Sequence, residues 1–402
     1  MTEKTNYAWP VTSSSKEEYS AFCEWMISNQ KMLEHNEIAI WGAGIRGTEF
    51  SIFFKRNNFT KIFFTDSNKQ KWGGYINEFP IVDIDTLKKK MATGRVKILI
   101  STENSKEIEE GLIKESYVKQ KDFFSIKSIL YEKYIEEFMR LYTNDILVMG
   151  DCEFSKISLT DKDMRNLGEM LKDELGEPAT KVLAMHGMGL RSHYNLLRMQ
   201  IAQGMIPKIL VIMINLDTLT GKQHLLPRSQ HEELLKTVYQ KLDFCDREYE
   251  EYLEIVHERN KNLQAEFFTT NNINNVPMQT KSKLYMKINY LYTLDVNTEG
   301  IQYMIKIFRI AKERGIKVIP FIPPVNYELG EIIFGSKFKE RYSENISKIE
   351  EITTEAGFKL LDMSYCLRQE EFAQPNTPDE TANDIGRTKM ANILVKNIET
   401  II

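Results

Sequence analysis

Short apolar runs alternate with amphipathic stretches along most of the chain. These runs occupy residues 36–41, 61–66, 96–102, 145–150, 181–187, 208–216, 316–322 and 358–363. They are mostly apolar on both faces, which is typical of strands covered by helices on two sides. Strands that alternate with helices predict βαβ units, so we expect an α/β protein with mainly parallel sheets.

The strands fall into two series, and a chain of 402 residues is long enough for two domains. We predict one three-layer α/β/α domain over residues 1–130, a connecting helix over 131–143, and a second such domain over 144–402. Amphipathic periodicity predicts further helices over 16–33, 298–314, 338–356 and 385–402.

Residues 217–296 do not follow the alternation of strands and helices. A charged, helix-like segment over 247–268 is followed there by a polar stretch over 269–283. We interpret this region as a mostly helical insertion that caps the ligand-binding edge of the second sheet. Its acidic helix around 248–258 is a solvated face or a contact between copies in a homo-oligomer.

Composition narrows the range of partners. Hydrophobic residues make up 42% and charged residues 27% of the chain, as in globular proteins. The formal net charge is -4 and both signs are intermixed, which argues against a general nucleic-acid binder. No stretch approaches the roughly 20 apolar residues that cross a bilayer. The first residues, MTEKTNYAWPV, lack a signal-peptide pattern, so we expect a cytoplasmic protein without a membrane span.

The cysteines do not form a metal-binding or disulfide pattern. Cys23, Cys152, Cys245 and Cys366 are far apart and show no C-x-x-C spacing. We therefore expect neither a structural metal nor a disulfide framework.

A glycine cluster follows the first predicted strand. Gly42, Gly44 and Gly47 form a complete G-x-G-x-x-G between a strand and a helix, and Asp66 ends the next strand. In such turns one glycine gives tightness, one lets a phosphate approach and one allows helix packing, while the acid binds a ribose hydroxyl. The cluster predicts a bound nucleotide or nucleotide sugar; the alternative is a tight turn without a ligand.

The segment from Ile38 to Thr102 resembles a specific module. Its stretches IWGAGIRG and DSNKQKWGGYINEFPIVDIDTL are similar to the Rossmann-like N-terminal domain of bacterial sugar acyltransferases and some glycan-biosynthesis enzymes. The resemblance implies nucleotide-sugar binding and a setting in surface-polysaccharide biosynthesis.

The segment VMGDCEFS, at the start of the second strand series, resembles the first block of the SGNH (GDSL-like) hydrolases and acyltransferases. The family's Gly-Asp-Ser reads Gly-Asp-Cys here, so Asp151 and Cys152 match it, with Cys152 at the nucleophile position. The resemblance implies a flavodoxin-like sheet with the nucleophile at a strand-to-helix turn, close to backbone amides that stabilise an oxyanion. The alternative is a small buried cysteine with a structural role.

Two further blocks can be matched to this family. Gly189 (or Gly187) follows the second strand of the series, where the family offers a backbone amide. Asn215 follows the third strand, where the family places an oxyanion-hole asparagine. Both lie after successive strands, where ligands bind in open α/β sheets.

The last block departs from the family pattern. The family has D-x-x-H, whereas the chain reads PDETANDIGRTKMA, in which Asp379 matches the aspartate and Asn383 and Gly386 match later positions. The catalytic histidine is missing. The site is inactive and only binds ligand, or Cys152 works with Asp379 alone, or another histidine substitutes. The candidates for such a substitute are His186, His193, His224 and His231.

Three classes of function remain open at this stage. The first is an acyl esterase or O-acyltransferase acting on a sugar or glycan precursor, with a small-molecule or glycan substrate. The second is a catalytically inactive module that binds a nucleotide sugar or glycan. The third is an NAD-dependent oxidoreductase that uses the glycine turn and Asp66, although the second domain offers no obvious group for hydride transfer.

Overall fold

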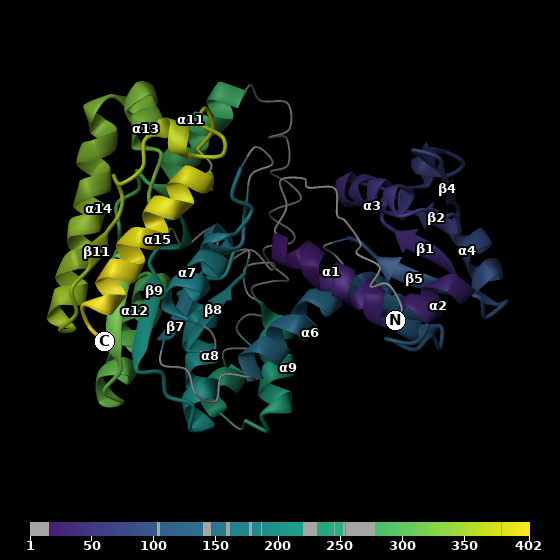
Figure 1. Ribbon diagram of the computed structural model, residues 1–402, viewed down its shortest axis with the longest axis horizontal. Helices are drawn as coiled ribbons and strands as arrows, with labels where there is room; N and C mark the ends of the chain where they lie inside the picture. Colours follow the sequence, from purple (N-terminus) through teal and green to yellow (C-terminus); the bar gives the residue numbers. More distant parts are fainter. Residues whose placement is uncertain are drawn as a thin grey trace. The chain divides into compact units, whose positions relative to one another are not determined.

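A computed structural model describes residues 16–102, 105–139, 146–157, 161–176, 179–185, 187–219, 231–244, 246–251, 254, 278–378 and 380–402. The chain divides into two compact units, Met1–Glu137 and Phe138–Ile402 (Figure 1). The boundary lies within helix α6 (Ile126–Met139). Each unit contains its own sheet and its own hydrophobic core.

The first unit is built on a six-stranded sheet of order β3-β4-β2-β1-β5-β6. Its strands are β1 (Glu37–Trp41), β2 (Ile62–Thr65), β3 (Tyr75–Ile76), β4 (Phe79–Val82), β5 (Val96–Ile100) and β6 (Phe123–Ser125). Only β3 runs antiparallel to its neighbour, so the sheet is mixed.

Helices cover both faces of the first sheet, because successive strand residues point to opposite sides. The helices are α1 (Lys16–Ser28), α2 (Gln30–His35), α3 (Ile45–Arg56), α4 (Ile84–Met91), α5 (Ser105–Lys114) and α6, with a short 3₁₀ turn, η1 (Lys69–Lys71). Ile38 and Ile40 of β1 pack with residues of α1 and α3, whereas Ala39 packs with residues of α4 and α5.

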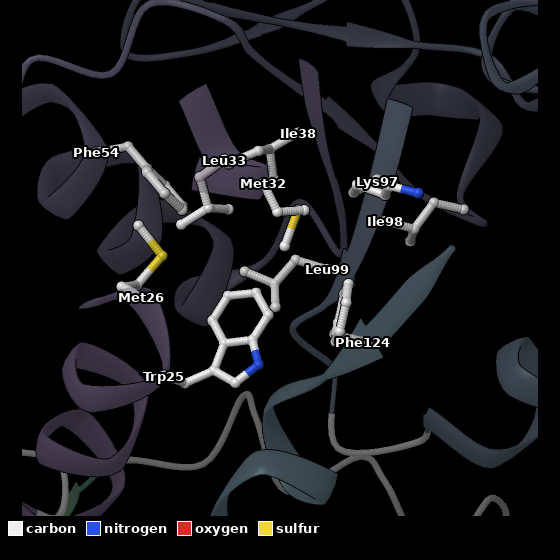
Figure 2. Close-up of a pocket in the computed structure, with 10 residues that line it drawn as sticks. All are labelled: Trp25, Met26, Met32, Leu33, Ile38, Phe54, Lys97, Ile98, Leu99 and Phe124. Carbon is white, nitrogen blue, oxygen red and sulfur yellow. The ribbon is translucent and has the colours of Figure 1, made fainter. Parts of the chain in front are cut away.

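One small cavity interrupts the packing under the first sheet (Figure 2). Apolar side chains line it almost entirely, including Trp25, Leu33 and Phe124. Its volume of about 10 Å³ has room for a single water molecule at most. We interpret it as a packing defect of the core and not as a ligand site.

The second unit is built on a five-stranded, fully parallel sheet of order β11-β10-β9-β7-β8. Its strands are β7 (Ile146–Gly150), β8 (Thr180–Ala184), β9 (Ile209–Met213), β10 (Lys317–Ile322) and β11 (Leu361–Asp362). Val148 of β7 lies between Val182 of β8 and Val211 of β9, and such β-branched residues suit a sheet that is buried on both faces.

The helices and 3₁₀ turns whose full bounds lie within the described residues of the second unit include η2 (Cys152–Phe154), α7 (Leu167–Leu175), α8 (Leu190–Ala202), η3 (Leu216–Leu219), α9 (Glu232–Lys241), α11 (Met278–Asn289), α12 (Glu299–Glu313), α13 (Tyr327–Phe334), α14 (Ser336–Glu355), η6 (Gln369–Glu371) and α15 (Asp384–Glu399). α7 and α15 lie side by side and share one core with the sheet, and α8 lies beside α12 (Figure 1).

Both sheets reverse their strand order beside the first strand of their series. The reversal lies between β1 and β5 in the first sheet, and between β7 and β9 in the second. In open parallel sheets, ligands bind outside the carboxyl ends of the strands at such a point. The glycine turn follows β1, and Cys152 and Asn215 follow β7 and β9, so the predicted site residues lie at these positions.

The prediction of an α/β protein with mainly parallel sheets is confirmed. Every strand predicted from an apolar run is present, and β3, β4 and β6 are additional. The expected connecting helix over 131–143 overlaps α6, which begins earlier, at Ile126. Within the predicted insertion the structure describes helical elements, while most of 220–277 lies outside the described residues.

Of the helices that the structure describes, none has the length and apolar character of a bilayer-spanning segment.

Candidate functional site

A sharp turn after β7 sets up the candidate site. Asp151 caps the one-turn helix η2, and its carboxylate accepts a hydrogen bond from the Glu153 amide at 2.9 Å. Gly150 is required here, because a Cβ atom on it would lie 2.3 Å from the Phe154 ring. The chain therefore turns back on itself and places Asp151, Cys152 and Glu153 at the carboxyl end of β7.

Side chains from three segments meet at this turn. The Asn215 amide nitrogen, just beyond β9, donates to Asp151 Oδ2 at 3.3 Å and to Glu380 Oε2 at 2.7 Å. The buried Tyr290 hydroxyl of the insertion donates to the other oxygen of Glu380. A continuous chain of hydrogen bonds thus runs from Tyr290 through Glu380 and Asn215 to Asp151.

Two more carboxylates complete an acidic group that we call the carboxyl cluster: Asp151, Glu153, Asp217 and Glu380. Glu153 is buried, and its Oε1 accepts from Thr381 Oγ1 at 3.5 Å. The backbone amide of Asp217 donates to Asn215 Oδ1 at 3.2 Å. Asp217 Oδ1 is shielded from solvent and has no hydrogen-bond partner among the described residues.

Burial and mutual repulsion favour the protonated forms of these acids. Burial raises the pKa of Asp151 and raises that of Glu380 well above its usual value. Burial, with repulsion from Asp151 and Glu153, raises the pKa of Asp217 to about 8. Asp217 therefore keeps its proton at neutral pH, and Asp151 and Glu380 ionise less readily than an exposed carboxyl group.

This pKa shift makes a prediction about stability. An unfolded aspartate has a pKa of about 3.9. Between about pH 4 and pH 8 the unfolded chain therefore loses the Asp217 proton while the folded chain keeps it, and the folded state becomes less stable as the pH rises. Asp217→Asn should remove this loss, so its melting temperature should exceed that of the wild type more at pH 8 than at pH 5.

Differential scanning calorimetry at both pH values measures this difference. Glu340→Gln, which changes an exposed carboxylate of the same unit, is the matched control and should show no such trend. A lower melting temperature for Asp217→Asn at pH 8 would mean that the carboxylate is ionised and stabilising.

The Cys152 thiol lies within the carboxyl cluster. Its Sγ and one oxygen each of Asp151 and Glu153 lie within 4.8 Å of one another. Burial and the Asp151 charge raise the thiol pKa well above its usual value, whereas Lys156, which also hydrogen-bonds to the thiol, lowers it. Lys156 Nζ also lies 3.7 Å from Glu153 Oε1. The resting site thus holds a protonated thiol beside one amine and several carboxyl groups.

A metal ion could bridge the donor atoms of Asp151, Cys152 and Glu153 at this spacing. Lys156 already brings a positive charge to the same group of atoms. We therefore assign no metal to this position.

His193 lies near the turn but does not serve Cys152 in this arrangement. Its ring is buried in α8, and Nε2 is 3.0 Å from the carbonyl oxygen of Gly150, a contact in which Nε2 carries the proton. Burial lowers the pKa of His193 to about 4, so the ring is neutral. Across the described chain, no hydrogen bond is recorded between His193 and Cys152, and Nδ1 has no partner.

Gly189, another predicted site residue of the second unit, lies in a small pocket. Gly189 is the residue before α8 and lines a small pocket with Arg191, Thr218 and Glu299. Arg191 is buried and lies 3.1 Å from Glu299. Gly189 and Asn215 come after β8 and β9, which are successive in the chain but lie on opposite sides of β7 in the sheet.

Asp379, His186 and His224 lie outside the described residues. Asn383, which matched a later position of the last block, caps α15 by accepting from the Gly386 amide at 3.0 Å. His231 is buried directly before α9, with a left-handed backbone.

In the first unit, the glycine turn has two glycines that the fold itself requires. Gly42 has φ +126°, and a Cβ on Gly47 would lie 2.2 Å from the carbonyl oxygen of Gly42. Gly44, which precedes α3, has an ordinary negative φ and no heavy atom within 4 Å of the place of a Cβ. Of the three glycines, only Gly44 could be replaced by a larger residue without strain or a clash within the fold. Its backbone is therefore the part of the turn that a ligand would approach.

Asp66 holds this turn to the rest of the unit. Its Oδ2 accepts from the Ala43 amide at 2.7 Å and from Lys71 Nζ at 2.9 Å, and its Oδ1 accepts from the Asn68 amide at 2.8 Å. These bonds keep the pKa of Asp66 below its usual value despite its partial burial. The Asp66 carboxylate therefore has a structural role in the turn, whether or not it also binds a ribose.

Sequence reasoning missed several members of the second site: Glu153, Lys156, Asp217, Tyr290 and Glu380. Two of them carry a usable signal. Lys156 lies four residues after Cys152, on the same face of a helical turn, and Asp217 lies two residues after Asn215. Tyr290 belongs to the insertion and carries no motif.

No protein-family model matches the chain, and no curated protein matches it. The resemblances to SGNH hydrolases and to the Rossmann-like module therefore stay predictions, and the site itself must carry the functional argument.

Proposed function

We propose that the second unit is an acyl esterase or O-acyltransferase in which Cys152 carries the acyl group as a thioester. The acceptor is a hydroxyl group of a sugar or glycan precursor, or water in the esterase case. The sugar and the setting in surface-polysaccharide biosynthesis follow from the resemblance of residues 38–102. The chemistry follows from the second site.

One observation carries this proposal: Asn215 bridges the segment after β7 and the segment that holds Glu380. Three blocks that are far apart in sequence thereby meet at one edge of the sheet, around a thiol. Buried carboxyl groups that lack enough hydrogen bonds or opposite charges destabilise a protein. Such groups are therefore found mainly at sites of binding or catalysis. The point of strand reversal is also where such sheets bind ligands.

The site offers each group that acyl transfer needs. Cys152 supplies the nucleophile, and the carboxyl cluster supplies groups that accept and return protons near neutral pH. The Gly189 amide and the Asn215 amide are the candidate donors to the oxyanion. The Asn215 amide nitrogen donates to Asp151 and to Glu380, so a bound acyl group would have to replace one of these contacts.

Incubation with 4-nitrophenyl acetate tests the proposal. We expect release of 4-nitrophenol and a single acetyl adduct on Cys152, detected by intact mass and peptide mapping. Cys152→Ala should lose the adduct and at least 100-fold of the release rate, because no other group forms the thioester. Cys366→Ala, a cysteine outside the carboxyl cluster, is the matched control and should behave like the wild type.

Absence of adduct and turnover with this ester and with acetyl thioesters would overturn the proposal. The second unit would then be a catalytically inactive module that binds its sugar ligand through the same edge of the sheet.

A second candidate function belongs to the first unit, and the geometry of Gly44 favours it. We propose that the turn before α3 binds the phosphate of a nucleotide or nucleotide sugar. The open space at Gly44 and the helix N-terminus behind it suit an anion. Asp66 already accepts three hydrogen bonds within the protein, so a hydrogen bond to a ribose would be a fourth. This argues against the NAD-dependent oxidoreductase, in which Asp66 would bind the ribose.

A further inference from the structure

Cys152 and Lys156 form a pair within one short turn. The amide of Lys156 donates to the Cys152 carbonyl oxygen at 2.9 Å, the spacing of a helical turn. Residues four apart on such a turn present their side chains on the same side. The Lys156 amine lies 3.7 Å from Glu153 Oε1, and the Cys152 thiol lies within 4.8 Å of an oxygen of the same carboxyl group, so the amine and the thiol share one small space. A hydrogen bond from Lys156 lowers the pKa of the thiol.

The charges around the thiol make this amine important. The neighbouring carboxyl groups of Asp151 and Glu153 oppose a negative charge on sulfur, and Lys156 favours one. Among the described residues, the ionisable groups that join this cluster from other elements are acids and a phenol: Asp217 of η3, Tyr290 of the insertion, and Glu380. His193 contributes no positive charge, because its ring is neutral and bonded to Gly150.

We propose that Lys156 is a catalytic residue, whose ammonium group stabilises the Cys152 thiolate in place of the missing histidine. This inference rests on the proposed acyl-transfer function and deepens it. A cation in contact with sulfur is the usual means of making a cysteine nucleophilic. The i, i+4 spacing supplies that cation from the same turn, so no distant residue needs to reach the thiol.

The proton balance of the reaction is as follows. The thiol proton passes to a carboxylate of Asp151 or Glu153 while sulfur bonds to the acyl carbon. The bond between that carbon and the leaving oxygen breaks, and the carboxylic acid returns the proton to this oxygen, which leaves as an alcohol. The acceptor hydroxyl then gives its proton to the same carboxylate and attacks the thioester. Cys152 leaves as a thiolate held by Lys156 and then takes the proton back from the carboxylic acid, which restores the starting thiol and carboxylate.

The rate of alkylation by iodoacetamide measures the fraction of Cys152 that is present as thiolate, and the experiment needs no substrate. Each unit of increase in thiol pKa lowers the thiolate fraction, and hence the alkylation rate below that pKa, about tenfold. We expect Lys156→Met to alkylate at Cys152 at least 10-fold more slowly than the wild type at pH 7.5. Lys156→Arg, which keeps the charge, should stay within about threefold. Peptide mapping reports Cys152 separately from Cys23 and Cys366, which serve as internal references.

The same variants should differ in acyl transfer. Lys156→Met should form the acetyl adduct from 4-nitrophenyl acetate at least 10-fold more slowly, because less of the thiol is present as the thiolate, and Lys156→Arg should recover most of this rate. Lys396→Met changes an exposed lysine of α15 and is the matched control. Circular dichroism verifies that each variant is folded.

The outcomes separate the two ideas. Acyl transfer that depends on Cys152 but not on Lys156 would overturn the role of Lys156 and leave the proposed function intact. Alkylation that depends on Lys156, without acyl transfer by the wild type, would keep the thiolate role and overturn the proposed function. Alkylation rates that are equal in the wild type and Lys156→Met would overturn the inference directly.

Discussion

Replacing Arg387 by methionine is expected to destabilise the second unit by about 3–5 kcal/mol, the usual cost of leaving a buried charge without its partner. Arg387 Nη1 donates to Asp161 Oδ2 at 2.6 Å, and both side chains are only 1% exposed. The same guanidinium donates to the carbonyl oxygens of Ala382, Arg165 and Asp163. Methionine fills similar space but leaves the Asp161 carboxylate and three carbonyl groups without their donor.

Urea unfolding can assign this loss to one unit. All four tryptophans, Trp9, Trp25, Trp41 and Trp72, precede residue 138, so their fluorescence reports on the first unit, while circular dichroism reports on both. Arg387→Met should lower the midpoint of the dichroism transition and leave the fluorescence transition in place. The double variant Asp161→Leu/Arg387→Met should recover part of the loss, because it removes the unpaired charge. A double variant less stable than Arg387→Met would contradict this account.

Gly47→Ala is expected to destabilise the first unit and to leave the second unit unchanged. The expected loss is about 3 kcal/mol, in the upper part of the range for overpacked sites. A Cβ at this position would lie 2.2 Å from the Gly42 carbonyl oxygen and 3.2 Å from its carbon. Both are backbone atoms of the turn after β1, so no side-chain rotation relieves the contact. α3 would have to move away from the sheet, and the tryptophan fluorescence transition should shift.

Gly44→Ala is the matched control for this prediction. Its Cβ meets nothing within 4 Å, so we expect a stability change of a few tenths of a kcal/mol, the ordinary cost of alanine in place of glycine before a helix. The same variant tests the second candidate function. If the turn binds a phosphate group, Gly44→Ala should weaken the binding of uridine diphosphate at least 10-fold in calorimetry. Equal binding by both proteins would place the ligand elsewhere or show that none binds at this turn.

Most of the fold could be predicted because long apolar runs determine it. The runs that became β1, β5, β7, β9 and β10 are largely buried on both faces, and their short length and β-branched residues favour strands over helices. β3 and β6 were not predicted, because they are only two and three residues long and are too short to show a hydrophobic period. The limits of the domains stay a prediction.

The site was predictable only where a residue directly follows a strand. Asp151, Cys152 and Asn215 come within two residues of the ends of their strands, and the structure brings Asp151 and Asn215 into contact. Glu380 was missed because the family pattern directed attention to its neighbour Asp379, and Tyr290 was missed because it comes from an insertion far away in sequence. The electrostatic state of the thiol depends on burial and on neighbours from three segments, so no local pattern contains it.

The strand order of the second sheet also affects the order of events in folding. β7, β8 and β9 are close in sequence and can pair early, whereas about a hundred residues separate β9 from its other neighbour, β10. During synthesis on the ribosome, one side of β9, with the apolar sequence ILVIM, therefore remains unpaired until β10 has emerged. An open edge of this composition is a template for wrong pairing between nascent chains, so the newly made protein is expected to depend on chaperones during this interval.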